Sequence, residues 1–105
     1  DNFIYVIDGQ KLISFDNFGN YRTSFETNKH IVGISFYNES ILLLEKDTIF
    51  VKNRKYEDVN IIDIKNLLPD KENLSHLIMR DIFVFNDKLY LLSNKKLFIF
   101  NITNI

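Results

Sequence analysis

The side chains that could bind a metal are the first candidates for chemistry in this chain of 105 residues. It contains two histidines, His30 and His76, and no cysteine. Structural zinc sites use four cysteine or histidine ligands, typically in closely spaced pairs, and the sequence has no such pair. Calcium loops need alternating Asp or Asn residues around a glycine, and that pattern is missing too. The sequence therefore predicts ordinary solvated histidines, no metal site and no cofactor.

A catalytic triad is the second chemistry to consider, because Ser75 and His76 are adjacent and Asp70 is nearby. Triad residues come from separate elements, with the nucleophile on a strained turn. The sequence has no G-x-S-x-G motif, and its three glycines are isolated, so a glycine-rich phosphate loop is excluded as well. Most acidic residues fall at expected turns, where Asp side chains bond to the local backbone. We therefore predict no catalytic residue and favour a non-enzymatic function.

Charge and hydropathy exclude two classes of partner. The net charge is −1 at pH 7, so the chain lacks the positive field that attracts nucleic acids and anionic membranes. Two short basic clusters, Lys52–Lys55 and Lys95-Lys96, are expected to be solvated hairpin tips. No apolar run approaches the roughly 18 residues of a membrane-spanning helix. We predict a soluble chain with no nucleic-acid partner and no membrane insertion.

The elements that carry these side chains recur along the sequence. Residues 82–101 align without gaps on residues 34–53, an offset of 48 residues. Residues 4–16 align in the same way on residues 41–53, an offset of 37 residues. A period of about 40 residues built from short strands is typical of propeller blades rather than of helical arrays.

The central strands of these copies are apolar at every position, as in Ile41–Leu44, Leu89–Leu92 and Leu97–Phe100. Antiparallel strands with one wet face alternate between apolar and polar residues. Continuous apolar runs bounded by turns instead indicate strands covered on both faces. Tight turns at Asp8-Gly9 and Ser93-Asn94 indicate antiparallel hairpins. We therefore predict antiparallel sheets stacked face to face, as blades are around an axis.

Two stretches resemble a known family. Leu12–Glu26, LISFDNFGNYRTSFE, resembles the strand–turn–strand half of an NHL-type or other six-bladed β-propeller repeat, and Arg80–Asn101, RDIFVFNDKLYLLSNKKLFIFN, resembles the other half. The Gly-His and Trp-Asp dipeptides of WD40 blades are missing, and the chain has no tryptophan. The resemblance implies consecutive antiparallel blades and a non-catalytic interaction or scaffold role. It favours an extracytoplasmic location, although composition leaves the compartment open.

The predicted fold is all-β, with about two and a half consecutive antiparallel blades of an incomplete propeller; a small β-sandwich is the alternative. One propeller-like segment is expected over 1–105, with an irregular insert at 65–78 in which Asp70 is a candidate cap for a helical turn. Gly33, inside a strand, predicts close approach of two backbones. The blade repeats are expected at about 2–26, 31–64 and 79–105. The strands expected before the insert are 2–7, 11–15, 21–25, 31–37, 40–44, 48–52 and 56–64.

The length of the chain indicates how the fold is completed. Propellers have about four to eight blades, more than this chain provides. A fragment of a blade stack exposes a packing face at each end, and its open strand edges invite pairing with other chains. We therefore expect the partner to be the remaining blades of a larger propeller, another protein, or further copies of this chain.

The favoured function is a non-catalytic protein-interaction or scaffold module that binds through loops at one end of the blades. One alternative is a fragment of a propeller enzyme whose catalytic residues lie outside this chain. The other is a structural subunit that associates with itself. The loop residues expected to contact a partner are Asp8, Gln10, Lys29, His30, Lys46, Asp47, His76, Asn94 and Lys95.

Overall fold

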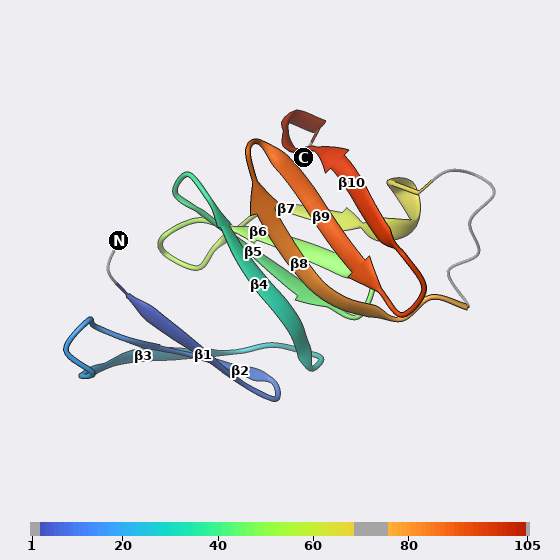
Figure 1. The fold of residues 1–105 in the computed structure, drawn as a ribbon. Helices are drawn as coiled ribbons and strands as arrows, with labels where there is room; N and C mark the ends of the chain where they lie inside the picture. Colours follow the sequence, from blue (N-terminus) through green and yellow to red (C-terminus); the bar gives the residue numbers. More distant parts are fainter. Residues whose placement is uncertain (1–2, 69–75, 105) are drawn as a thin grey trace. The chain divides into compact units, whose positions relative to one another are not determined.

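The computed structural model describes residues 3–68 and 76–104, which form ten β-strands in three antiparallel sheets (Figure 1). The described residues contain no α-helix; their helical segments are short 3₁₀ turns, among them η1 (Ile64–Asn66) and η3 (Ile102–Asn104). The prediction of an all-β fold is confirmed. The chain divides into two compact units, Asp1–Ile31 and Val32–Ile105.

The first unit is one three-stranded sheet with the order β1-β2-β3. Its strands are β1 (Ile4–Asp8), β2 (Lys11–Phe15) and β3 (Tyr21–Glu26). Along β2 the residues alternate, so that Leu12 and Ser14 are buried while Ile13 and Phe15 are half-buried on the opposite face. The turn between β1 and β2 is made by Gly9 with φ +60°, a conformation that glycine adopts without steric cost.

The second unit contains two sheets, one of four strands in the order β4-β5-β6-β7 and one of three strands in the order β10-β9-β8. The four-stranded sheet comprises β4 (Ile31–Tyr37), β5 (Ser40–Glu45), β6 (Thr48–Lys52) and β7 (Asp58–Asp63). The three-stranded sheet comprises β8 (Met79–Phe85), β9 (Lys88–Ser93) and β10 (Leu97–Asn101).

One apolar core joins the two sheets of this unit. It draws on β5, β6, η1, β8, β9, β10 and η3, so the sheets pack face to face. Burial of a large apolar side chain contributes roughly 1.5–3 kcal/mol, which makes this core the main source of stability of the unit. The buried members are Leu42, Leu44, Ile49, Ile64, Leu68, Met79, Ile82, Leu89, Leu91, Phe98 and Ile102.

Hairpin turns of the second unit use residues in the left-handed backbone region. Asn86 and Asp87, between β8 and β9, have φ values of 51° and 59°, as a two-residue type I′ turn requires. Asn38, at the turn between β4 and β5, has a φ of 54°. Asn and Asp tolerate this region because their short polar side chains bond locally. These residues explain why the two turns are tight.

The corner between β2 and β3 is organised by one carboxylate. The Oδ1 atom of Asp16 accepts hydrogen bonds from the backbone N–H groups of Phe18 and Asn20, both at 2.9 Å. Gly19 has a φ of +87°, and its N–H donates to the carbonyl oxygen of Asp16. The strand register shifts next to this corner, between Ser14 and Phe15.

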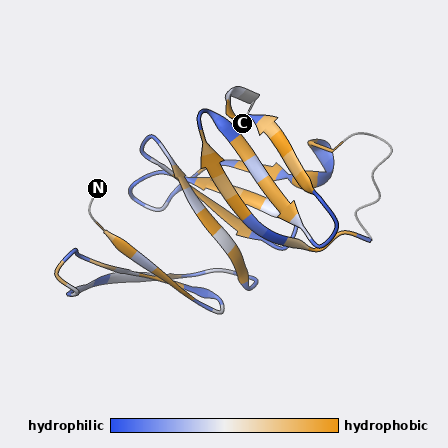
Figure 2. Ribbon diagram, in the orientation of Figure 1, coloured by the Kyte–Doolittle hydropathy of each residue, from blue (hydrophilic) through white to orange (hydrophobic). Residues whose placement is uncertain are grey.

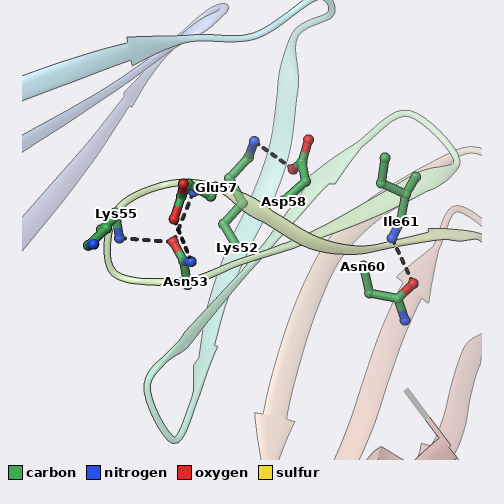
Figure 3. A network of polar contacts seen from close by, with 7 residues as sticks. All are labelled: Lys52, Asn53, Lys55, Glu57, Asp58, Asn60 and Ile61. Atoms are coloured by element: carbon green, nitrogen blue, oxygen red, sulfur yellow. Dashed lines mark hydrogen bonds and ion pairs between the residues drawn. The ribbon is translucent and has the colours of Figure 1, made fainter.

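The same corner recurs between β6 and β7, 37 residues later (Figure 3). The Oδ1 atom of Asn53 accepts hydrogen bonds from the N–H groups of Lys55 at 2.9 Å and Glu57 at 3.0 Å. Tyr56 takes the place of the glycine, with a φ of +62°, and its N–H donates to the carbonyl oxygen of Asn53. The register again shifts, between Val51 and Lys52. The segments β1–β3 and β5–β7 therefore share their local structure.

Two edge strands of the second unit, β4 and β8, approach each other closely. A Cβ atom on Gly33 would lie 2.7 Å from the Oδ1 atom of Asp81 and 3.2 Å from the backbone nitrogen of Ile82. Two residues further on, the N–H of Val84 donates to the Oγ atom of Ser35 at 3.0 Å. The close backbone approach that was predicted at Gly33 is confirmed.

The strand predictions agree closely with the structure. β2, β4 and β6 have the predicted bounds, while β7 is shorter than the predicted 56–64. The division at residues 31 and 32 was not predicted. The part of the insert that the structure describes begins with η1, whereas Asp70 and the predicted helical turn lie outside the described residues. One propeller-like segment with three blade repeats stays a prediction.

Candidate functional site

Four of the predicted loop residues come together in the first unit. Asp8 and Gln10 flank the turn at Gly9, and the segment after β3 folds back onto this turn. The N–H of Ile31 donates to the carbonyl oxygen of Gly9 at 2.9 Å, and the Nε2 atom of Gln10 donates to the carbonyl oxygen of Asn28 at 3.4 Å.

His30, in the loop after β3, lies against the β1–β2 turn at Gly9. The His30 ring is 3.8 Å from the position that a Cβ atom on Gly9 would occupy. Lys29 is exposed, and its carbonyl oxygen accepts a hydrogen bond from the Thr27 hydroxyl at 2.6 Å. The turn of β1–β2 and the loop after β3 therefore form one local surface that presents both signs of charge and an imidazole.

The remaining loop residues lie in the second unit, at the end of its sheets where the β5–β6 and β9–β10 turns are found (Figure 1). The N–H of Ile64 donates to the carbonyl oxygen of Asp47 at 3.0 Å. Asn94 forms a reciprocal pair with Ile78: its N–H donates to the Ile78 carbonyl oxygen and its Oδ1 atom accepts from the Ile78 N–H, both at 2.9 Å. Each turn is thus fixed by a connecting segment.

The charged and imidazole groups of these turns stay at the surface. Lys46, Lys95 and His76 are exposed. The two histidines belong to different units. In residues 3–68 and 76–104 no three His, Asp or Glu side chains lie close enough together to hold a metal ion. The same part of the chain contains no helix long and apolar enough to cross a bilayer.

One of the predicted basic clusters differs from its prediction. Arg54 and Lys55 are exposed, as expected of a hairpin tip, but the Lys52 side chain is only 12% exposed. Its ammonium group lies 2.8 Å from Asp58 Oδ1 (Figure 3) and 4.3 Å from the centroid of the Tyr56 ring. The aliphatic stem of a lysine packs on apolar surface while its head group keeps a partner, so this cation is a structural element of the corner.

Burial also changes the pKa of the Tyr56 phenol at this corner. Desolvation raises the pKa of Tyr56 to about 12, with the negative charges of Glu45 and Asp58 adding to the effect. In the first unit the shift is opposite: hydrogen bonds to Asp16, above all from the Asn20 backbone, hold the pKa of that carboxyl below its usual value. Each shift is caused by burial and by neighbouring groups of the same unit.

One exposed face of the β8–β10 sheet is a further candidate for binding. The sequence predicted it only as the uncovered packing face at the end of a stack of sheets. One face of the β8–β10 sheet carries nine residues in three cross-strand rows, hereafter called the open face. The first row is Asp81, Leu92 and Leu97, the second is Phe83, Tyr90 and Ile99, and the third is Phe85, Lys88 and Asn101.

Apolar side chains of the open face are in contact with solvent. Phe83, Phe85, Leu92, Leu97 and Ile99 are each between 45% and 56% exposed, and Figure 2 shows hydrophobic residues along all three strands. A fully covered phenylalanine buries roughly 150–250 Å², so Phe83 and Phe85 alone leave about 200 Å² of apolar surface open, and the three aliphatic side chains add to it. The largest apolar patch on a monomer is often functional.

Aromatic rings of the open face contact one another. The Phe83 ring stacks on Phe85 with a centroid distance of 6.2 Å and contacts Tyr90 at 6.1 Å. Tyr90 also pairs across the sheet with Ile99. Rigid aromatic side chains lose little conformational entropy on association, so this face is suited to binding another apolar surface.

Comparison with known proteins identifies no family: no protein-family model matches the chain, and no curated protein matches it.

Proposed function

We propose that this chain is a non-catalytic protein-interaction or scaffold module of the β-propeller type. Its sheets are structural repeats that stack on one another, and its loops at one end of the sheets bind a protein partner. The observation that carries this proposal is the correspondence between the open face and the face of the neighbouring sheet that is already covered.

Repeat positions relate these two faces. Residues 48 positions before Tyr90, Leu92 and Leu97 are Leu42, Leu44 and Ile49. All three belong to the apolar core between the sheets. The opposite face of β8–β10, which includes Leu89, Leu91 and Phe98, supplies the other side of that core.

The face of β4–β7 that packs on β8–β10 is equivalent, in the repeat, to the open face of β8–β10. The two sheets therefore stack with the same orientation. A dimer-like arrangement would instead bring equivalent faces together. Stacking in one direction leaves the next equivalent face free to accept a further sheet, as in arrays of structural repeats. This supports a module built from consecutive blades, whose faces serve assembly and whose loops remain free for recognition.

The loop assignment is tested by substitutions that replace charged loop side chains with neutral amides. The first variant combines Lys46→Asn, Asp47→Asn and Lys95→Gln at one end of the sheets. The matched control combines Glu39→Gln and Asp87→Asn at the opposite end. Asn is used at Lys46 and Asp87 because both have positive φ, which Asn tolerates. Captured proteins are quantified by mass spectrometry, and folding is followed by thermal unfolding.

The first variant should retain its unfolding midpoint and lose at least about tenfold in capture of the protein partner, which corresponds to about 1.4 kcal/mol. The control variant should bind as the wild type does. Equal loss in both variants would overturn the assignment of the binding end. A wild-type protein that captures no partner, or a first variant that captures all partners normally, would overturn the interaction function.

A further inference from the structure

We propose that the open face of β8–β10 binds the β1–β3 sheet of a second copy of this chain, through a face that contains Ile4, Val6, Ile13 and Phe15. The contact is head to tail, because the two faces differ. This inference rests on the stacked repeats of the proposed function and adds the identity of the occupant.

The repeat defines the kind of surface that covers an open face. Within the second unit, the face that covers β4–β7 is formed by Leu89, Leu91, Phe98 and Phe100, which lie in or against the shared core. The β1–β3 residues at the same repeat positions are Ile4, Val6, Ile13 and Phe15. All four are apolar, so β1–β3 has the same kind of docking face as β8–β10.

This docking face is uncovered within the chain. Ile4 is 50% and Val6 44% exposed, and Ile13 and Phe15 are half-buried. Ile4 pairs across the sheet with Phe15, and Val6 with Ile13, so the four side chains form one compact apolar square. The ring of Phe15 is supported by an edge-to-face contact with Tyr21 at 6.3 Å between centroids.

The chain thus carries one uncovered face of each kind, in different units. The five half-exposed apolar side chains of the open face supply part of the roughly 800 Å² that each partner contributes to a standard interface. Because a head-to-tail contact uses unlike faces, it produces either a closed ring or an open chain of copies.

One variant for each face tests the contact by sedimentation equilibrium of the 105-residue chain. Ile99→Lys places a charge on the open face, and Val6→Lys places one on the docking face. Both positions are about half exposed, so the substitutions should leave the folded monomer intact. Phe18→Lys is the matched control, because Phe18 is 85% exposed at the β2–β3 corner and belongs to neither face.

Wild type and Phe18→Lys should form species above 12.5 kDa, whereas each face variant alone should associate about 30-fold more weakly or worse, as expected at a hot-spot position. An equimolar mixture of the two face variants should form a dimer and nothing larger, because each variant retains one intact face. This complementation is specific to a contact between unlike faces.

Other outcomes would overturn the inference. A wild-type chain that stays monomeric at concentrations up to about 1 mM would have a dissociation constant above that value and would contradict binding of a second copy. Loss of association in Ile99→Lys with no effect of Val6→Lys would show that open faces pair with each other. Neither result bears on the loop substitutions of the proposed function, whose failure is detected separately by partner capture.

Discussion

At the scale of single residues, the two corners show how one hydrogen-bonding role is filled by different side chains. Asp16 and Asn53 each accept two backbone N–H groups. Such side-chain acceptors replace the ladder bonds that the backbone gives up at a turn. An aspartate does this with a charge that depends on pH, and an asparagine does not. The two units should therefore respond differently to acid.

The first prediction concerns Asp16. Hydrogen bonds, the strongest from the Asn20 backbone, hold its folded pKa below the unfolded value of 3.8. A lowered folded pKa adds stability that is fully present above the unfolded pKa and is lost as pH falls through the folded pKa. Acid should thus weaken the β2–β3 corner, and Asp16→Asn should abolish this dependence.

Amide hydrogen exchange of Phe18 and Asn20 between pH 2 and pH 5, corrected for intrinsic rates, measures this effect. The reverse substitution at the second corner is the control: Asn53→Asp should make the hydrogen exchange of the Lys55 and Glu57 amides sensitive to acid in the same pH range. Protection at Phe18 and Asn20 that is equally acid-sensitive in wild type and Asp16→Asn would contradict the explanation.

The second prediction concerns the Tyr56 phenol. Desolvation, assisted by Glu45 and Asp58, raises its pKa from 10.0 to about 12. A raised folded pKa adds stability that is present below the unfolded value and is lost as pH rises through the folded value. The ultraviolet difference titration between wild type and Tyr56→Phe should show one phenol with a midpoint near 12. A midpoint at 10 would show that the ring is solvated.

At the scale of elements, the approach of β4 to β8 depends on a residue without a side chain. Gly33 lets the edge strands β4 and β8 approach each other, and the Oγ atom of Ser35 accepts the hydrogen bond from the N–H of Val84. The repeat positions on β8 hold Asp81 and Phe83 instead. A sheet that covers the open face cannot approach β8 as closely as β8 approaches β4. We expect the Phe83 side chain to take part in that contact.

The third prediction tests this approach with Gly33→Ala. The new Cβ would lie 2.7 Å from Asp81 Oδ1 and 3.2 Å from the nitrogen of Ile82. The carboxylate can move but the backbone cannot, so we expect a loss of about 1–3 kcal/mol in the free energy of unfolding. Denaturant unfolding measures the loss.

Two further variants separate the causes. Asp81→Ala in the Gly33→Ala background should recover only part of the loss, because the clash with the β8 backbone remains. Ser35→Ala, which removes the acceptor of Val84 N–H without a clash, should cost about 1 kcal/mol. Gly33→Ala with wild-type stability would show that the distance between β4 and β8 does not depend on the missing side chain at position 33.

Much of this element structure follows from the sequence. Short apolar runs and turn residues such as Asn86 and Asp87 locate the strands within a few residues, because turn chemistry is local. Which face of each sheet is buried in the core does not follow from the sequence, because runs such as Ile41–Leu44 are apolar at every position and do not alternate. Tyr56 in a left-handed position was also not predicted, because tyrosine rarely adopts this region and the residue type gives no signal for it.

The candidate site was predictable in part for the same reason. The loop residues stand out as polar stretches between apolar strands, and most of them lie in the connections between strands, whereas Asp8 is the last residue of β1. The open face has no sequence signal of its own: Phe83, Tyr90 and Ile99 differ from their buried neighbours only in lacking a covering sheet. Which of two apolar faces is covered depends on how the sheets stack, and that is a property of the tertiary structure.

At the scale of the whole molecule, the repeat gives the chain two unlike uncovered faces. Core packing between β4–β7 and β8–β10 shows how such faces meet: Leu91 belongs to the core and Val51 packs against it. Their repeat equivalents are Val6 on the docking face and Ile99 on the open face. Stacking that continues in the same sense should therefore bring Val6 of one copy close to Ile99 of another.

Cross-linking tests this central claim most directly, because the chain contains no cysteine and any introduced thiol is unique. Val6→Cys and Ile99→Cys chains of distinguishable mass are mixed and treated with a short bis-maleimide, and the products are identified by mass spectrometry. We expect the mixed dimer to be the dominant product and Phe18→Cys mixed with Ile99→Cys to give little. Predominant Ile99→Cys homodimers, or no enrichment of the mixed product over the Phe18→Cys control, would contradict it.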